Sequence, residues 1–311
     1  MKVGFIGLGI MGASMASNLQ AAGHALHVHD IRREAAARHL AAGAVWMATP
    51  RVMAEAVDVV FLSLPGPPEV ESVALGADGL VHGMRRGSAV FDLSTNAPAL
   101  IRRLHALFRD KGVDVLDAPV SGGPVGAKTG KLAIWVGGDR TLFDRHKPLL
   151  DAMGDQAYYV GPIGAGAVAK LVHNCTSFAV RAVMAETFSV GVKAGVDPLA
   201  LWKAVRQGAT GRRRTFDGLM DKFLPGVYEP PSFALRLGHK DVSLATALGR
   251  ELGVPMRLAN MALEELTEAL NRGWGDRDSS SFMLMEAERA GIELAVPPEK
   301  LRAVIEEDRR S

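Results

Sequence analysis

The sequence predicts an α/β fold in which an N-terminal doubly wound parallel sheet is followed by a long inter-domain helix and an all-α C-terminal domain. In the first half, short apolar runs alternate with helical patterns, as in sheets that helices cover on both faces. A proline-free, mostly apolar stretch then runs from Gly166 to about Val192, and only helical patterns follow it. We therefore place the three parts at residues 1–162, 163–193 and 194–311.

The bulk composition restricts the class of protein. The chain has 311 residues, enough for two domains with substantial cores, and its net charge of +2 gives no reason to expect a nucleic-acid partner. Its one cysteine, Cys175, excludes a disulfide scaffold and fits a reducing cytoplasm. No stretch approaches the roughly 20 apolar residues of a membrane span, and residues 1–6 resemble a strand more than a signal peptide. We expect a cytoplasmic protein that binds neither nucleic acid nor membrane.

A glycine-rich loop lies between the first predicted strand, residues 2–7, and the helical pattern after it. In such a GxGxxG loop the first glycine permits a tight turn, the second lets a pyrophosphate approach bare backbone, and the third allows close helix–strand packing. The helix N-terminus then directs free N–H groups at the phosphates. Because the required strand and helix are both present, we predict a Rossmann-type dinucleotide-binding domain. The predicted cofactor-binding residues here are Gly7, Leu8, Gly9, Ile10, Met11 and Gly12.

The second predicted strand, residues 25–30, ends in an acid that bears on cofactor choice. A carboxylate at Asp30 can accept both ribose hydroxyls and would repel a 2′-phosphate, which favours NAD. Arg32 and Arg33 follow directly and could hold a 2′-phosphate, so NADP stays open as the cofactor. Asp30 could alternatively cap the next helix.

Further apolar runs in the first half predict buried strands, and a parallel sheet binds ligands beyond the carboxyl ends of its strands. Leu64-Pro65 and Ser94-Thr95 each follow one of these runs, and a glycine-containing segment follows Asp117. We therefore expect all three places to line one crevice. The strands are predicted over residues 57–64, 88–93, 113–117 and 132–137.

The segment after Asp117 contains Ser121, Gly122 and Gly123. Such a segment leaves backbone N–H groups exposed and can form a nest that suits a carboxylate. The same residues are also ordinary turn chemistry, and the segment alone leaves both interpretations open.

A polar stripe marks the long helix. Lys170, His173, Asn174, Ser177 and Arg181 recur at helical spacing on an otherwise apolar rod, so they share one face. The stripe lines a cleft or is the solvated edge of a packing helix. A lysine and an asparagine one turn apart can act on one ligand, which favours the cleft.

The C-terminal part has helical patterns throughout. Asp197 is a good N-cap, and Pro198 fits the first turn of the helix after it. Arg212, Arg213 and Arg214 form a dense charge run, which is a solvated helix start, a nucleic-acid or membrane patch, or an anion-recognising rim. Three arginines are few for nucleic acid. The helical patterns cover about 200–207, 215–224, 233–251, 255–272 and 279–290.

Four motifs occur in the order known from one enzyme family, and together they cover most of the chain. They are the Gly7–Gly12 loop with residues 15–19, Asp117–Gly123, Gly164–Gly166 with Lys170 and Asn174, and Lys240-Asp241, while Ser94-Thr95 with Pro98 fits a fifth, softer motif. On these motifs the chain resembles the β-hydroxyacid dehydrogenases, such as 3-hydroxyisobutyrate dehydrogenase and tartronate semialdehyde reductase.

The resemblance implies a role for each matching position. It implies that Lys170 is the catalytic residue with Asn174 as its substrate-orienting partner, and that the C-terminal part serves substrate binding and dimerisation in a homodimer or homotetramer. The family often has Asn-Asn where this chain has His173-Asn174, and relatives that reduce imines lack the lysine. The implied substrate-binding residues are Ser121, Gly122, Gly123 and Ser94, and the further implied cofactor contacts are Leu64, Pro65, Thr95 and Lys240.

The expected function is hydride transfer between NAD, or NADP, and a small 3-hydroxy acid or its semialdehyde. The nicotinamide carries the hydride, and Lys170 exchanges the hydroxyl proton if its surroundings lower its pKa. The alternative is a catalytically silent, dinucleotide-sensing protein of the same fold. A nucleic-acid-associated protein that uses the arginine run is a weaker third hypothesis. We expect no metal, because the nine histidines show no ligand spacing.

Overall fold

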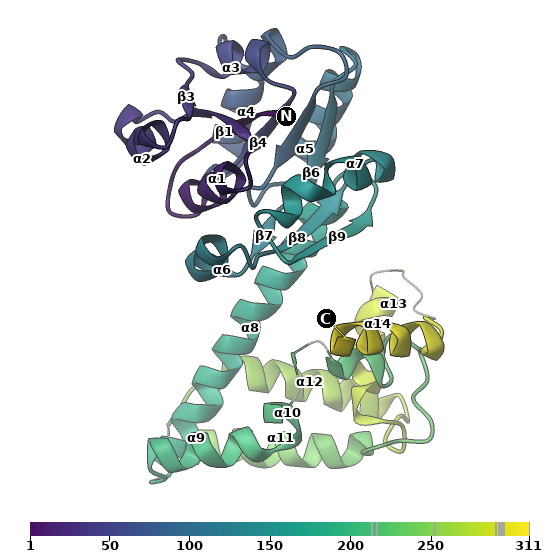
Figure 1. Ribbon diagram of the computed structural model, residues 1–311. Coiled ribbons are helices and arrows are strands. Elements are labelled where there is room, and N and C mark those ends of the chain that lie inside the picture. The colour runs from purple at the N-terminus through teal and green to yellow at the C-terminus, as the bar shows by residue number, and fades with distance from the viewer. Residues whose placement is uncertain (213, 216, 252, 290, 292–295, 311) are drawn as a thin grey trace. The chain divides into compact units, whose positions relative to one another are not determined.

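Figure 1 shows the computed structural model of the chain, which describes residues 1–212, 214–215, 217–251, 253–289, 291 and 296–310. The chain divides into two compact units, Met1–Thr176 and Ser177–Ser311. The boundary lies within helix α8, Ala165–Lys193, so this helix carries residues of both units. Its bounds agree closely with the long helix that the apolar stretch predicts.

The first unit is built on a nine-stranded sheet in the order β3-β2-β1-β4-β5-β6-β8-β7, with β9 paired to β8. From β3 to β6 every neighbouring pair is parallel. This part confirms the doubly wound parallel sheet, and the strand order reverses between β1 and β4, where such sheets bind ligands. The strands are β1 Lys2–Ile6, β2 Ala25–His29, β3 Val45–Trp46, β4 Val59–Leu62, β5 Ala89–Asp92, β6 Asp114–Asp117, β7 Val120–Ser121, β8 Ala133–Gly137 and β9 Gln156–Gly161.

The far edge of the sheet differs from the prediction. β8 runs antiparallel to β6 and β7, and parallel to β9. A parallel crossover needs a long connection, whereas the helix between β7 and β8, α6 Gly123–Thr129, has only 7 residues, so the chain returns alongside β7. The sequence does not predict β3, β7 or β9, because two-residue strands show no periodicity and β9 has no buried residue.

Both faces of the sheet are buried, and each has its own hydrophobic core. Successive strand residues point to opposite faces, so Phe5 packs in one core and Ile6 in the other. In the first core Phe5, Phe61 and Phe91 are in register on β1, β4 and β5, with ring centroids 6.3 and 5.2 Å apart, and this row of rings ties the central strands together. The other helices of this unit are α1 Gly12–Ala21, η1 Arg33–Ala36, α2 Ala37–Ala41, α3 Pro50–Ala56, α4 Pro67–Leu75, η2 Leu80–His82, α5 Pro98–Arg109 and α7 Arg140–Asp151.

A buried carboxylate fixes the start of α8. The Asp117 side chain, at the end of β6, accepts hydrogen bonds from the N–H groups of Gly164 at 2.7 Å and Ala167 at 2.6 Å. A helix leaves its first N–H groups without internal partners, and a negative charge beside them is also favourable. A Cβ at Gly166 would lie 2.1 Å from the Trp135 carbonyl oxygen, so only glycine lets α8 rest on β8 at this point.

The described part of the second unit is helical, as the sequence predicts. Asp197 caps its first complete helix by accepting a hydrogen bond from the Ala200 N–H at 2.9 Å. The helix predicted over residues 215–224 is wrong, because a short 3-10 helix, η3 Asp217–Met220, lies there and includes Gly218, a poor α-helix former. The remaining helices are α9 Pro198–Gln207, α10 Ala209–Arg212, α11 Leu235–Glu251, α12 Arg257–Asn271, η4 Ser279–Phe282, α13 Met283–Arg289 and α14 Pro298–Arg310.

Two buried histidines make the first unit sensitive to acid. His39 and His146 are 1% and 6% exposed. Burial lowers the pKa of both rings below 6.5, and the neighbouring positive charges of Arg38 and Arg145 lower them further. The stability contributed by the neutral rings is complete above pH 6.5 and is lost as the pH falls below it, because the unfolded chain then takes up protons that the folded chain does not.

We expect the free energy of unfolding to fall between about pH 6.5 and pH 5, and His146→Leu to remove part of this dependence. His146 suits the test because its ring packs edge-on against Phe91 in the core, so an apolar side chain there keeps apolar contacts. Urea unfolding at a series of pH values gives the measurement, and His82→Gln at an exposed position is the control. The same pH dependence in His146→Leu and in the wild-type protein would contradict the prediction.

Candidate active site

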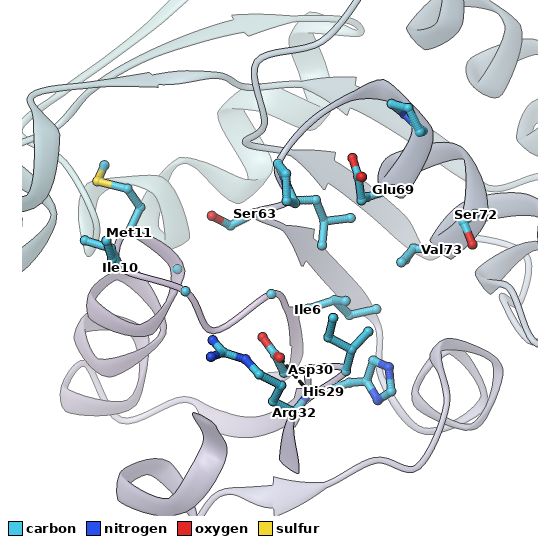
Figure 2. A pocket seen from close by; sticks show the side chains of 17 residues that line it. Ile6, Ile10, Met11, His29, Asp30, Arg32, Ser63, Glu69, Ser72 and Val73 are labelled. Carbon is cyan, nitrogen blue, oxygen red and sulfur yellow. Dashed lines mark hydrogen bonds between the residues drawn. The ribbon is translucent and has the colours of Figure 1, made fainter. Parts of the chain in front are cut away.

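A cavity of about 710 Å³ lies beside the carboxyl ends of β1, β2 and β4, where the sheet order predicts a ligand. Figure 2 shows Ile10 and Met11 at one side of this cavity, Asp30 and Arg32 after the end of β2, and Glu69 on α4. The predicted cofactor residues that line it are Gly7, Gly9, Ile10, Met11, Gly12, Asp30, Leu64 and Pro65.

The three glycines of the loop have the different surroundings that their proposed tasks require. A Cβ at Gly7 would lie 2.2 Å from the Ser63 carbonyl oxygen, and one at Gly12 would lie 1.9 Å from the Gly7 carbonyl oxygen. Gly9, in contrast, has no atom within 4 Å of where its Cβ would stand. Gly7 and Gly12 are therefore needed because a side chain would clash with neighbouring backbone. Gly9 leaves bare backbone beside the cavity, as a pyrophosphate needs. The residues present fit a dinucleotide.

Asp30 is bound to the glycine loop. Its carboxylate accepts hydrogen bonds from the Leu8 N–H at 2.7 Å and the Arg32 N–H at 2.9 Å. The residue before the next helix, η1, is Arg32, so Asp30 does not cap that helix. Leu8 itself is buried and meets Asp30 through its backbone, and its side chain packs in the core.

The two arginines after Asp30 have different surroundings. Arg32 is exposed and lines the cavity. The Arg33 guanidinium lies 5.6 Å from the centroid of the Trp46 ring, a cation–π contact. Arg32 is therefore the one of the two placed at the cavity wall.

A hydrogen-bonded network joins the segments after β4 and β5. The Leu64 N–H donates to the Ser94 Oγ at 2.9 Å, and the Ser94 N–H donates to the Asp92 carboxylate at 3.0 Å. The Asn96 side-chain amide donates to the other Asp92 oxygen at 2.8 Å. Ser94 is only 6% exposed, so it bridges two loops, while Thr95 beside it is exposed.

Asp92 is a buried acid that its partners hold in place. Burial raises the pKa of its carboxyl to about 6, although the hydrogen bonds from Asn96 and Ser94 lower it. The negative charge of Asp117, in register with Asp92 on the next strand, adds to the increase. The sequence predicts no role for either aspartate: Asp92 ends an apolar run, and Asp117 begins the Asp117–Gly123 motif without being assigned a function there.

Lys170, His173 and Ser121 come together in the first unit. The Lys170 Nζ lies 5.9 Å from the centroid of the Trp135 ring, and the His173 ring centroid lies 5.1 Å from it. The His173 Nε2 is 3.3 Å from the Ser121 Oγ. Burial lowers the pKa of Lys170. Asn174 is the next residue of α8 after His173 and is half-buried.

The backbone after Ser121 has a shape that only glycine adopts easily. Gly122 and Gly123 have φ values of 134° and 62°, both positive, and both residues are exposed. The structure thus places two exposed glycines with positive φ directly after Ser121, whose hydroxyl contacts His173 of α8. Sequence reasoning missed Trp135, whose only signal was an aromatic residue in a predicted strand.

Several predicted residues cannot be placed in this group. Lys240 lies on α11, but its side chain, like those of Asp241, Ser177 and Arg181, is outside the described residues. Arg213 is also outside them. Arg212 ends α10 and Arg214 donates its backbone N–H to the Asp217 carboxylate at 3.2 Å; both are exposed.

Two further properties concern only the part of the chain that the structure describes. In that part, no three His, Cys, Asp or Glu side chains gather as metal ligands. None of its helices is long and apolar enough to cross a membrane.

Comparison with known proteins extends over both units. The profile of the NAD binding domain of 6-phosphogluconate dehydrogenase matches residues 2–161. A second profile, described as the NAD-binding part of NADP-dependent 3-hydroxyisobutyrate dehydrogenase, matches residues 164–286.

Individual relatives match along nearly their whole length. The chain is 33% identical to 2-(hydroxymethyl)glutarate dehydrogenase of Eubacterium barkeri over 95% of this chain and 98% of that protein. It is 34% identical to NAD-dependent L-serine dehydrogenase of Pseudomonas aeruginosa over 90% and 95% of the two chains. The solved structure of 3-hydroxyisobutyrate dehydrogenase from Salmonella typhimurium matches with a TM-score of 0.60 at 31% identity, over 92% and 99% of the two chains.

These matches agree with the glycine loop, the cavity and the resemblance inferred from the motifs. They establish an NAD(P)-dependent oxidoreductase that acts on small hydroxy acids or aldehydes. The chain belongs to the 3-hydroxyisobutyrate dehydrogenase, or β-hydroxyacid dehydrogenase, family.

Proposed function

We propose that this protein interconverts a small 3-hydroxy acid and its semialdehyde, with Lys170 as the general acid and base. The observation that carries the proposal is the position of Lys170. Its amine has a pKa lowered by burial, and it shares the Trp135 ring with His173, which in turn contacts Ser121. A lowered pKa makes the amine a better proton donor as its ammonium and leaves more of it neutral to act as a base.

In the proposed reaction the residues of this chain hold the substrate and move one proton. The neutral Lys170 Nζ accepts the hydroxyl proton during oxidation, and in reduction its ammonium returns a proton to the aldehyde oxygen. The nicotinamide accepts or supplies the hydride. Asn174, on the following turn, orients the same oxygen. Alignment of this kind can supply roughly 7–11 kcal/mol of the barrier.

The substrate carboxylate is proposed to bind at Ser121, Gly122 and Gly123. The positive φ values of the two glycines support this role, because they expose successive backbone N–H groups in the shape of an anion nest. Two of the relatives are named for acids that carry a hydroxymethyl group, 2-(hydroxymethyl)glutarate and L-serine. A hydroxymethyl group is also what Lys170 would deprotonate here. Ser94 is proposed to support this pocket, since it bridges the loops beside it.

The cofactor is proposed to be NAD, bound along the cavity with its pyrophosphate against Gly9 and the start of α1. The bare backbone at Gly9 supports this placement. Leu64, Pro65 and Thr95 then contact the cofactor from the ends of β4 and β5, and Lys240 closes the nicotinamide end. NADP is the alternative, since Arg32 lines the same cavity as Asp30.

The assembly is proposed to be a homodimer or homotetramer. The proposal rests on the family resemblance, in which the helical C-terminal domain often pairs with a second subunit. Sedimentation velocity measures the mass directly, and a monomer at micromolar concentration would reject this proposal.

Replacing Lys170 tests the reaction. We expect Lys170→Ala to retain cofactor affinity and to lose about 10²–10⁴-fold or more in kcat, because the proton acceptor is gone. Steady-state kinetics with a panel of 3-hydroxy acids, together with a cofactor titration, gives both values. Lys128→Ala, at an exposed lysine on α6, is the matched control. Near-normal turnover in Lys170→Ala would reject the mechanism, and a wild-type protein that binds cofactor but turns over no hydroxy acid would favour the silent sensor.

Cofactor choice can be tested at the residues after β2. We expect Asp30→Asn to lower the ratio of kcat/KM for NAD over NADP by about tenfold, which is ~1.4 kcal/mol, because the carboxylate no longer repels a 2′-phosphate. Arg32→Ala should weaken use of NADP, whereas Arg33→Ala should not, since the Arg33 guanidinium lies over Trp46. Equal effects of the two arginine substitutions would contradict this assignment.

A further inference from the structure

Trp135 contacts two residues of the proposed site, Lys170 and His173. Its neighbours on β8, Ile134 and Val136, are fully buried in the core under the sheet. Because side chains alternate along a strand, the indole of Trp135 lies on the other face and is half-buried. There it contacts both Lys170 and His173.

The backbone of Trp135 is fixed from two sides. Its N–H donates to the Pro119 carbonyl oxygen at 3.1 Å. Its carbonyl oxygen lies directly under Gly166, where a Cβ would approach to 2.1 Å. Residues 166, 170 and 173 follow one another at helical spacing on one face of α8. One residue of β8 therefore supports three successive positions of that face.

We propose that Trp135 is a positioning residue that holds the Lys170 ammonium and the His173 ring on one aromatic surface and so aligns Lys170 with Ser121. This inference rests on the proposed function and adds to it a residue that touches neither substrate nor cofactor. The face of an indole attracts a cation, so the ring favours the ammonium form of Lys170 against the cost of its burial. His173 is held by the same ring and reaches the Ser121 hydroxyl at 3.3 Å.

The ionisable groups around the ring are few enough to separate. Lys170 and His173 face it from α8, and the Asp117 carboxylate lies at the start of that helix, bound to Gly164 and Ala167. From β9, Tyr158 is in register with Trp135 and is exposed. Tyr158→Phe removes the phenol and serves as a control.

Two substitutions distinguish stabilisation of the Lys170 ammonium by the Trp135 ring from apolar packing alone. Trp135→Met keeps an apolar side chain but removes the ring, and Trp135→Phe keeps a smaller, weaker ring. If the face stabilises the ammonium, the pH at which Lys170 loses its proton should fall in the order wild type, Trp135→Phe, Trp135→Met. Space filling alone predicts no such order, only changes in stability.

The direct test is a ¹³C NMR titration of the protein labelled at the lysine Cε and free of cofactor, with Lys170 assigned by its loss in Lys170→Ala. We expect the Lys170 titration to move to lower pH by about half a unit in Trp135→Met, while the Lys128 resonance is unchanged. Loss of the ring current should also move the Lys170 signal downfield. If Trp135→Met does not fold, an intermediate shift in Trp135→Phe supports the proposal, and an unchanged titration in either folded variant overturns it.

The pH profile of aldehyde reduction gives the second readout. The alkaline limb of kcat should shift to lower pH in Trp135→Met, in the same direction as the NMR titration, with KM for the cofactor unchanged. An unshifted alkaline limb would overturn the role of Trp135 while leaving Lys170 as the acid. Full turnover in Lys170→Ala would instead reject the proposed function, whatever Trp135 does, so the two failures are distinguishable.

Discussion

The contact between the Asp117 carboxylate and the first turn of α8 is the constraint on which the site depends. It ties the end of β6 to the helix that carries Lys170 and His173. Burial raises the pKa of the Asp117 carboxyl above its usual value. The hydrogen bonds that the carboxylate accepts from backbone N–H groups reduce this increase. Asp92 is in register with Asp117 on the neighbouring strand β5. It accepts a hydrogen bond from the Ser94 N–H and so orders the segment after β5. Two neighbouring strands thus each end in a buried acid that orders the chain after it.

The fold could be predicted where local sequence carries the information. The glycine loop, the parallel strands β1, β2, β4, β5 and β6 and the length of α8 all follow from patterns that repeat within a few residues. The reversal at β8 could not, because it depends on how the chain after Ser121 packs against a strand that comes later. The bounds of η3 were also missed, since a helical pattern with glycine does not distinguish a 3-10 turn from an α-helix.

The sequence predicts which residues form the site, but not which of them contact one another. The sequence suggested a cleft at Lys170 and a nest at Ser121, but their connection joins positions about fifty residues apart and runs through His173 and Trp135. Asp30 shows the same limit. The sequence leaves its carboxylate to meet a ribose or to cap a helix; the structure excludes the cap and shows a contact that neither alternative includes, with the Leu8 N–H of the glycine loop.

The absence of a side chain at Gly166 has a consequence for the position of Lys170. The helix meets the sheet there through main-chain atoms, so the height of Lys170 above β8 does not depend on the residues that surround the substrate. Lys170 is thus placed by a main-chain contact one turn before it as well as by the Trp135 ring that it shares with His173. If Lys170 is the proton carrier, as proposed, its distance from the sheet is set by backbone packing, and a substitution at Gly166 would displace it without touching any side chain of the site.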